Sequence, residues 1–498
     1  MSLKSQAAKI FANRAVKRMK KWANSPIETQ QKVLNQLILE GAKTAFGKDH
    51  DFEKISTYEE FRKAVPIRDY EGLKPYVDRV VDGEENVLWP GKPLYFAKTS
   101  GTTSGAKYIP LTKASMPSHI QAAQNAILCY IHETGKSSFV NGKMIFLQGS
   151  PEMTRKNGIG VGRLSGIVAH YVPSYLQKNR LPSWETNCID DWESKVNAIV
   201  NETKDEDMTV ISGIPSWVQM YFERLIATSR RPVGELFSNF DLFIYGGVNY
   251  EPYRTKFEAL IGRKVDSIEL YPASEGFFAF QDKQDKKGML LLLNSGVFYE
   301  FIPASTFFDK TPERIQLKDV KTEVNYVMIV STNAGLWGYN VGDTVAFTET
   351  KPYRIIVTGR IKHFISAFGE HVIGKEVEHG IKEAMEQFGF SISEFTVAPQ
   401  TTPTEEELPY HEWLIEFEEE PENLNDIRRY IDASMQRQNS YYFDLIEGKI
   451  LQPLKITSLK KGSFNDYMKS KGKLGGQNKV PRLANDRIIA DSLHALQR

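Results

Sequence analysis

Residues 94–110 contain a run whose residue types suit the binding of phosphate groups. An apolar segment, residues 94–97, leads into a stretch of threonines, serines and two glycines that is followed by a lysine. Glycines let backbone N–H groups approach an anion closely, hydroxyls donate hydrogen bonds, and the lysine adds positive charge. We therefore expect these residues to contact phosphate: Thr99, Ser100, Gly101, Thr102, Thr103, Ser104, Gly105 and Lys107.

This run differs from a Walker A loop. Only three residues separate Gly101 from Gly105, and Lys107 is followed by Tyr108 rather than by serine or threonine. A run of this composition is equally compatible with a plain solvated loop. The apolar segment before it and the lysine after it favour phosphate binding.

Further glycines and charged residues follow segments with the apolar pattern of strands. In open α/β sheets, ligands bind beyond the carboxyl ends of the strands. A glutamate there can hold Mg²⁺ beside substrate phosphates, an aspartate can accept hydrogen bonds from a ribose diol, and an arginine can neutralise a phosphate. The residues at these positions are Gly246, Gly247, Tyr271, Ala273, Ser274, Glu275, Asp343 and Arg360. Either carboxylate alone could be an ordinary surface or N-cap residue, whereas their joint occurrence indicates a nucleotide site.

A second substrate is expected to bind near residues 127–131, 161–171 and 212–218. The candidates there are Tyr130, Arg163, His170 and Ser216. Arg163 lies in a glycine-rich, otherwise apolar stretch, where a cation could meet a carboxylate. A surface ion pair for Arg163, ordinary core packing for the apolar neighbours and a structural role for His170 are the alternatives.

The elements that must position these residues alternate between strand and helix patterns. Strands at 208–212, 242–245 and 267–271 and helices at 114–134, 216–229 and 251–261 predict a largely parallel, helix-covered α/β sheet, with Ser216 as a helix N-cap. Beyond Arg360 the pattern changes to an α+β unit that includes a strand at 448–456. We predict a large domain at 1–360 and a separate C-terminal domain at 361–498.

Composition restricts the class of protein. A chain of 498 residues is too long for one core, and 63 basic against 62 acidic residues create no global field that would recruit nucleic acid or an acidic membrane. Cys129 and Cys188 are the two cysteines, which fits a reducing, cytoplasmic compartment. No run approaches the length of a membrane span, so we expect no stable membrane insertion.

The N-terminal segment has a separate character. Residues 1–27 contain seven lysines or arginines and no acidic residue. Apolar residues recur there at helical spacing, namely Ile10, Phe11, Ala15, Met19 and Trp22. The interpretation that we favour is a first helix that docks this stripe on the protein body. A transit segment and a membrane-surface helix are the alternatives.

The order of these motifs resembles the core motifs of the adenylate-forming (ANL) superfamily, which includes acyl-CoA synthetases, peptide-synthetase adenylation domains and luciferases. More narrowly, the chain resembles a bacterial-type member of the auxin-responsive acyl acid amido synthetase family (Gretchen Hagen 3). The resemblance runs from about residue 28 to 485 and rests on four motifs and a C-terminal pattern. These are Thr99–Lys107, Tyr271–Glu275, Tyr339–Asp343, Gly359-Arg360 with Gly369-Glu370, and Gly462 to Arg482.

This resemblance implies a role for each motif. The domain at 1–360 would bind ATP and the acyl substrate, and the domain at 361–498 would be a mobile lid. The 99–107 loop would clamp the β- and γ-phosphates of ATP, and Gly246, Gly247, Tyr271 and Ala273 would border the adenine. Ser274 and Glu275 would face the phosphates and Mg²⁺, Asp343 would bind the ribose, and Arg360 would lie near the ribose or the α-phosphate. Lys479 would be the mobile catalytic lysine, and residues 360–362 would form the hinge.

Three positions depart from the superfamily pattern. The ribose motif reads Tyr-Asn-Val-Gly-Asp, without the commoner arginine, so the contact of that arginine is in doubt. The hinge carries Lys362, and the motif around Lys479 differs from the usual Gly-Lys.

The implied reaction has two steps. A carboxylate attacks the α-phosphorus of ATP to give an acyl-adenylate and pyrophosphate, and an amine, expected to be an amino acid, then takes the acyl group. Charge neutralisation and alignment would drive the first step, and a closing lid would protect the adenylate from water. An acyl-CoA ligase and a catalytically silent nucleotide-binding protein are the alternatives.

Overall fold

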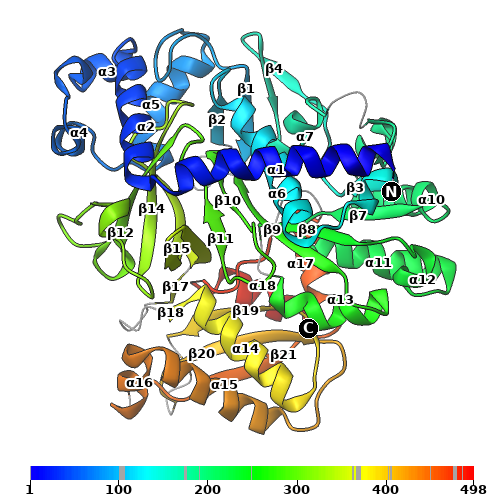
Figure 1. Cartoon of the computed structure of the whole chain (residues 1–498). Helices are drawn as coiled ribbons and strands as arrows, with labels where there is room; N and C mark the ends of the chain where they lie inside the picture. The colour runs from blue at the N-terminus through cyan, green and yellow to red at the C-terminus, as the bar shows by residue number, and fades with distance from the viewer. Residues whose placement is uncertain are drawn as a thin grey trace. The chain divides into compact units, whose positions relative to one another are not determined.

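The computed structural model describes residues 2–99, 107–172, 177–189, 191–247, 250–361, 364–365, 372–401, 403, 407–448, 450–474, 479–484 and 486–497. The chain divides into two compact units, coloured by residue number in Figure 1. Unit 1 comprises Met1–Val248, Leu260–Val341 and Val345–Ile356. Unit 2 comprises Asn249–Ala259, Gly342–Thr344 and Val357–Arg498.

A long sheet forms the centre of unit 1. In spatial order its strands are β13 (Ile315–Gln316), β12 (Val297–Pro303), β14 (Asn325–Thr332), β15 (Tyr339–Thr350), β16 (Tyr353–Arg360), β11 (Met289–Leu291), β10 (Gly276–Phe280), β9 (Asp266–Ala273), β8 (Leu242–Gly246), β7 (Met208–Ser212), β3 (Lys143–Phe146) and β6 (Arg180–Leu181). The run from β6 to β9 is parallel, and β9, β10, β11 and β16 pair antiparallel. The prediction of a parallel α/β sheet is confirmed for the five strands from β9 to β6.

Unit 1 also contains helices, some of which pack on this sheet. They are α1 (Leu3–Ala23), α2 (Pro26–Gly41), α3 (Ala45–Asp49), α4 (Tyr58–Ala64), α5 (Tyr70–Val81), α6 (Met116–Thr134), α7 (Leu164–Ala169), α9 (Trp184–Asn187), α10 (Trp192–Thr203), α11 (Pro215–Ser229) and α12 (Val233–Leu236). α6 packs on β9 and β10, and α2 packs on β12 and β14. The core beneath α6 is built from alternate apolar strand residues such as Ile244 and Ile268.

A smaller sheet carries the serine- and threonine-rich loop. Its order is β2 (Lys107–Leu111), β1 (Tyr95–Thr99), β5 (Ile159–Gly162) and β4 (Thr154–Lys156). β1 and β2 pair antiparallel, with Thr99 opposite Lys107. The described residues on either side of the 100–106 segment, Thr99 and Lys107, are therefore paired.

Unit 2 is an α+β fold. The sheet β19 (Ile392–Gln400), β20 (Tyr410–Phe417) and β21 (Lys455–Ser458) accompanies α13 (Glu251–Ile261), α14 (Gly374–Phe388), α15 (Leu424–Gln438), α16 (Ser440–Glu447), α17 (Ser463–Ser470) and α18 (Ile488–Gln497), and β17 (Phe364–Ile365) pairs with β18 (Val372–Ile373). Its core includes Trp413, Val377 and Ile431, which are fully buried. The predicted C-terminal α+β fold is confirmed.

Three local predictions are wrong. α11 begins at Pro215 with Ile214 as N-cap, rather than with Ser216 as the cap, because proline has a fixed φ that suits the first helical position. No strand begins at residue 448, since α16 ends at Glu447 and β21 begins only at Lys455.

The third error concerns the docked face of α1. Ala15 and Met19 are buried as predicted, but Ile10 and Phe11 are 55% and 57% exposed, and Ala12 is buried instead. Small residues on the inner face allow α1 to lie close to α6, so the small side chains define most of the docking stripe.

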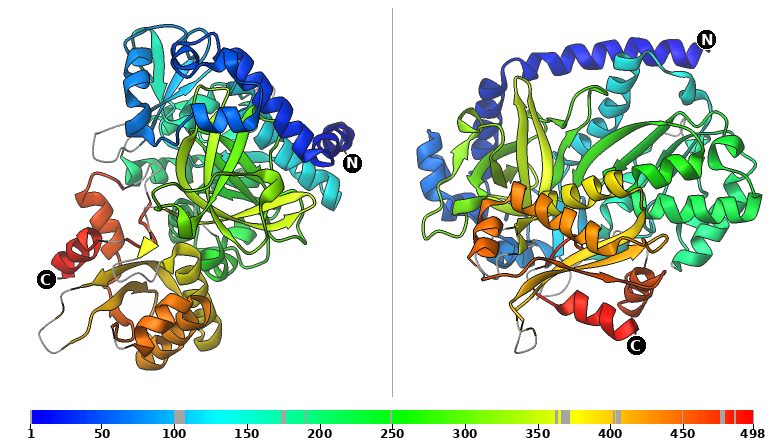
Figure 2. Two further views of the ribbon diagram at one scale, coloured as in Figure 1. Left: turned by 90° about the vertical axis from the view of Figure 1, so that its left-hand side faces the viewer. Right: turned by 90° about the horizontal axis from the view of Figure 1, so that it is seen from below.

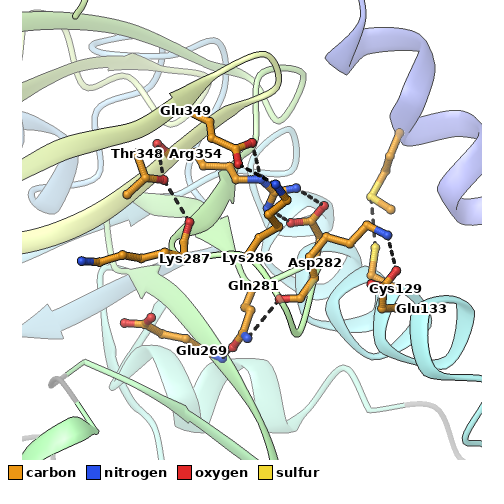
Figure 3. A network of polar contacts seen from close by, with 12 residues as sticks. Cys129, Glu133, Glu269, Gln281, Asp282, Lys286, Lys287, Thr348, Glu349 and Arg354 are labelled. Atoms are coloured by element: carbon orange, nitrogen blue, oxygen red, sulfur yellow. Dashed lines mark hydrogen bonds and ion pairs between the residues drawn. The ribbon is translucent and has the colours of Figure 1, made fainter. Parts of the chain in front are cut away.

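A network of ion pairs around the buried Arg354 contacts the strand that ends at Arg360 (Figure 3). Arg354, near the start of β16, pairs with Asp282, and its Nε lies 3.3 Å from Glu349 Oε2. Lys286 Nζ lies 3.3 Å from Glu349 as well. Breaking such a network would leave charges buried without compensation, so it holds β15 and β16 in register.

Within the described ranges, every helix is too short or too polar to cross a lipid bilayer.

Candidate active site

The carboxyl ends of four parallel strands of unit 1 lie along one edge of the central sheet. Ser212 of β7 is opposite Ile244 of β8, and Gly246 of β8 is opposite Leu270 of β9. β3 lies on the other side of β7 and ends at Phe146. The turns that follow these strands are therefore neighbours in space, as expected for a ligand-binding edge.

Glycine at the end of β8 permits a close approach between strands. A Cβ at Gly246 would lie only 2.5 Å from the carbonyl oxygen of Leu270, so any side chain there would separate β8 from β9. Gly247 has a φ of +83°, which favours glycine. The backbone conformation of Gly247 thus allows the chain to change direction directly after β8.

The predicted Mg²⁺ ligand lies in a tight turn. β9 and β10 form an antiparallel hairpin with Ala273 opposite Gly276, so Ser274 and Glu275 are its two turn residues. Ser274 is buried and Glu275 is half-buried. Tyr271 is buried, and its ring centroid lies 5.2 Å from that of Phe278. Glu275 therefore lies in the turn of a hairpin whose two strands are also joined by this ring contact.

The phosphate-loop candidates lie mostly outside the described residues. These are Ser100, Gly101, Thr102, Thr103, Ser104 and Gly105. The strands that carry them are well defined: Lys107 Nζ lies 5.6 Å from the centroid of the Tyr70 ring, and the hydroxyl of Tyr70 accepts a hydrogen bond of 2.9 Å from the Tyr108 N–H. Helix α5 therefore anchors the first two residues of β2.

Arg163 and His170 both lie against the segment that follows β3. A Cβ at Gly149 would lie 2.8 Å from Arg163 Cδ, so the arginine side chain passes directly over this glycine. His170 Nε2 donates a hydrogen bond of 3.1 Å to the carbonyl of Pro151. Ser216 lies in the first turn of α11, after β7. These three candidates belong to the same sheet edge as Gly246.

Tyr130 has a different position. It is buried, and its hydroxyl donates a hydrogen bond of 2.6 Å to Asp266 Oδ2. Asp266 is the first residue of β9, whereas Ala273 is the last. The structure therefore does not bring Tyr130 together with the other candidates, and its assignment to the acyl pocket stays a prediction.

Unit 2 brings together three charged candidates. Arg360 Nε donates a hydrogen bond of 2.8 Å to Asp343 Oδ1. Asp343 is 8% exposed, whereas the Arg360 side chain is 57% exposed. Hydrogen bonds of 2.8 Å from Thr358 to Thr344 and from the Ile361 N–H to the Gly342 carbonyl hold the two strand ends side by side.

Lys479, the third candidate, lies in the electrostatic field of this pair. Two effects lower the pKa of Lys479 to about 8: chiefly the loss of water around its ammonium group, and to a smaller extent repulsion from Arg360. Attraction to Asp343 partly offsets them by raising the pKa. Part of the lysine side chain remains exposed. The segment after it is anchored to β19, because Thr396 donates a hydrogen bond of 2.7 Å to the carbonyl of Pro481.

Arg482 is a supporting residue to which the sequence alone assigns no role. It pairs with Glu394, its Nε lies 3.5 Å from Glu378, and it donates a hydrogen bond of 2.8 Å to Tyr253 of α13. Its place in the C-terminal pattern is the one signal that could have pointed to it. Arg482 holds the strand-like segment that begins at Lys479.

No group of three or more histidine, cysteine, aspartate or glutamate side chains could hold a metal ion in the part of the chain that the structure describes. Glu275, at the β9–β10 turn, is therefore not part of such a group.

Three domain profiles of one family match most of the chain. They are the GH3 family N-terminal domain at residues 15–198, the GH3 family central domain at residues 290–360 and the GH3 family C-terminal domain at residues 375–488. The central-domain match ends at Arg360.

Amido synthetases from plants are among the similar proteins. The indole-3-acetic acid-amido synthetase GH3.15 of Arabidopsis thaliana is 22% identical and aligns over 91% of this chain and 90% of its own length. The jasmonoyl–L-amino acid synthetase JAR4 of Nicotiana attenuata is 23% identical, but this alignment covers 64% of the chain and 66% of that protein, just under two thirds.

Solved structures share the fold. The GH3.15 acyl acid amido synthetase superposes with a TM-score of 0.78 at 16% identity, covering 96% of this chain and 95% of that one. A 2-hydroxyisobutyryl-CoA ligase in the postadenylation state, in complex with 2-HIB-AMP, has a TM-score of 0.61 at 11% identity and covers 95% of this chain and 92% of its own. The adenylate-forming fold is therefore confirmed. The chain belongs to the GH3 family, as the order of its motifs predicted.

Proposed function

We propose that the protein is an ATP-dependent acyl acid amido synthetase. It forms an acyl-adenylate and pyrophosphate from a carboxylic acid and ATP, and then transfers the acyl group to an amine, with an amino acid as the expected acceptor. The observation that carries the proposal is the cluster of Lys479, Arg360 and Asp343 in unit 2. Lys479 and Arg360 are two cations that repel each other beside one carboxylate. A bound polyanion would reduce this repulsion, and its ribose diol would donate hydrogen bonds to the carboxylate.

Each residue of this cluster has a distinct task. Lys479 and Arg360 would neutralise the charge that develops when one anion attacks another at the α-phosphorus. Asp343 already accepts a hydrogen bond from Arg360, and its carboxylate would accept further bonds from the ribose hydroxyls. The same aspartate would therefore position both the nucleotide and the arginine.

The sheet edge of unit 1 carries a separate set of candidate residues, whose proposed roles follow from the family resemblance. Gly246, Gly247, Tyr271 and Ala273 would border the adenine, and the 99–107 loop would hold the β- and γ-phosphates. Arg163 lies over Gly149 at the same edge, where its guanidinium would bind the carboxylate of the acyl acid. Ser216 and His170 would line the same pocket.

The residues present fit a magnesium ion that is bound chiefly through the nucleotide. Mg²⁺ usually keeps several waters and takes one or two protein carboxylates in addition to substrate phosphates. Glu275 in its two-residue turn supplies one such carboxylate. A bound Mg²⁺ would supply additional neutralisation of phosphate charge.

Transfer of the acyl group requires protection of the adenylate. An acyl-adenylate is a mixed anhydride that water would hydrolyse, so a lid that excludes water until the amine arrives would raise the yield of amide. We assign this task to residues 361–498, with residues 360–362 as the hinge.

The test is pyrophosphate release across a panel of carboxylic acids. Each acid is assayed with ATP and Mg²⁺ alone, with a mixture of amino acids, and with CoA, and the products are identified by mass spectrometry. We expect acid-dependent release in the absence of any acceptor and amide formation only with an amine. Thioester formation with CoA would support the ligase alternative, and the absence of release despite bound ATP would support a silent nucleotide-binding protein.

A further inference from the structure

The outward face of α1 carries two kinds of side chain in an ordered arrangement. Residues 3, 7, 10, 14, 17 and 21 recur at intervals of four and three, so they form one line along the helix, opposite the buried residues. The first half of this line is apolar, with Leu3 85% and Ile10 55% exposed. The second half consists of Arg14, Lys17 and Lys21, all exposed.

The flanks of the helix extend both properties. Phe11, 57% exposed, lies beside the apolar half, and Arg18 lies beside the basic half. No hydrogen-bond or ion-pair partner contacts the basic side chains of α1 among the described residues; these are Lys4, Lys9, Arg14, Lys17, Arg18, Lys20 and Lys21. The segment also lacks any acidic residue before Glu28. The positive charge of this face is therefore uncompensated within the helix.

The inner face fixes α1 to the body of unit 1. Ser5 Oγ donates a hydrogen bond of 2.9 Å to the carbonyl of Ser137, and Met19 Sδ lies 3.9 Å from Cys129 Sγ of α6 (Figure 3). Figure 2 shows α1 along the outside of the unit, beside α6. The outward face is thus presented by a helix that is already folded, which reduces the entropy lost when it binds a surface.

We propose that the outward face of α1 binds the surface of an anionic lipid bilayer. Interfacial helices combine cations that contact lipid headgroups with apolar side chains that enter the acyl boundary. Leu3, Ile10 and Phe11 would supply the apolar insertion, and Arg14, Lys17 and Lys21 the headgroup contacts. The long stems of lysine and arginine can lie along the interface while their charges stay in water.

Other partners match this face less well. A second copy of the chain would bring the same positive charges together, and a nucleic acid would not bury Leu3 or Phe11. The net charge of the whole chain is only +1, so the attraction is local and is screened within about 10 Å at ordinary salt. Binding would be peripheral, reversible and salt-sensitive.

The experiment is vesicle flotation with the full chain. Vesicles of phosphatidylcholine alone are compared with vesicles of phosphatidylcholine and phosphatidylserine, at low and at high salt. Arg14→Gln, Lys17→Gln and Lys21→Gln are combined in one variant, and Leu3→Ser, Ile10→Ser and Phe11→Ser in another. The matched control combines Lys310→Gln, Lys318→Gln and Lys321→Gln, three exposed lysines elsewhere in unit 1.

We expect the wild type and the control to float with anionic vesicles and not with neutral ones. The charge variant should bind anionic vesicles at least about tenfold more weakly than the wild type. The apolar variant should likewise lose binding, at high salt as well. Unchanged thermal melting and pyrophosphate release would show that both variants fold.

Three results would overturn the proposal. The first is equal binding by the charge variant and the wild type, and the second is no vesicle binding at all. The third is tight binding to DNA or heparin without binding to anionic vesicles, since that would identify a polyanion site without an apolar contribution.

Discussion

The candidate residues of the two compact units differ in chemical character. In unit 1, the candidates lie at strand ends and tight turns that are rich in glycine and backbone groups. In unit 2, Asp343, Arg360 and Lys479 are charged groups, and we propose that they act through their charge. We therefore expect the contribution of unit 1 to tolerate changes of pH and the contribution of unit 2 to be sensitive to them.

Removing the carboxylate of Glu275 should have the largest effect of the changes in unit 1. Glu275→Gln keeps the size of the side chain but removes its charge, so we expect pyrophosphate release to fall below detection, because a neutral amide is a poor Mg²⁺ ligand. The measurement is acid-dependent pyrophosphate release over a range of Mg²⁺ concentrations, with Glu313→Gln as an exposed control. Full activity of the Glu275 variant would contradict the proposal that Glu275 binds Mg²⁺.

Removing the ammonium of Lys479 is the matching test of unit 2. Lys479→Ala should lower kcat for adenylation by about 10²–10³-fold, the usual cost of losing one group that stabilises transition-state charge. Lys471→Ala serves as the control, because Lys471 is exposed on the same unit. Stopped-flow detection of pyrophosphate separates this step from acyl transfer, and equal rates for the two variants would contradict the assignment.

Asp343 provides a test of nucleotide positioning. Asp343→Asn should raise the KM for ATP about ten- to a hundredfold, because hydrogen bonds to a charged group are lost. Deoxy-ATP analogues that lack a ribose hydroxyl should bind weakly to the wild type but lose little further in the variant. If the losses of affinity from the variant and from the missing ribose hydroxyl simply added, Asp343 would not bind the ribose.

The pH dependence of the reaction should separate the two units. The pKa of Lys479 is lowered to about 8, so the charged form decreases as pH rises through 8, and kcat/KM for adenylation should fall there. Lys479→Arg should move this decline to higher pH, because guanidinium stays protonated, although its overall rate is lower. An unchanged alkaline limb in the arginine variant would assign the titration to another group.

A modest effect is expected on the stability of unit 2. Burial raises the pKa of Glu376 to about 7, although the backbone N–H of Ile373 and the side-chain amide of Asn439 donate hydrogen bonds to its carboxylate. The folded state therefore retains a proton that the unfolded chain loses near 4.5, so stability falls as pH rises from about 4.5 through 7. Glu376→Gln should flatten this dependence in thermal melts, while Glu386→Gln, an exposed position on the same helix, should not.

Much of the fold could be predicted because its signals are local. The apolar runs at 208–212 and 242–245 coincide with β7 and β8 to within one residue, and the helix at 251–261 coincides with α13. The site residues at strand ends could also be anticipated, since glycines and carboxylates placed directly after apolar runs are typical of the ligand-binding edge of an α/β sheet.

The remaining features depend on tertiary contacts. The proximity of Lys479 to Asp343 and Arg360 joins segments from distant parts of the sequence, and no spacing rule predicts this. Periodicity alone misassigns part of the buried stripe of α1 because large apolar residues outweigh alanine in it, whereas close helix packing selects Ala12 and Ala15. Likewise, nothing in residues 249–259 indicates that they pack with unit 2.

Isotope labelling can follow the oxygen atoms of the acid through the proposed reaction. A carboxylic acid that is a substrate in the pyrophosphate assay is labelled with heavy oxygen in its carboxylate and incubated with ATP and an amino acid. We predict that one labelled oxygen appears in AMP and that the acyl group appears in the amide, because the carboxylate attacks the α-phosphorus and the amine then displaces AMP. Label in inorganic phosphate, or unlabelled AMP accompanying the amide, would contradict an acyl-adenylate.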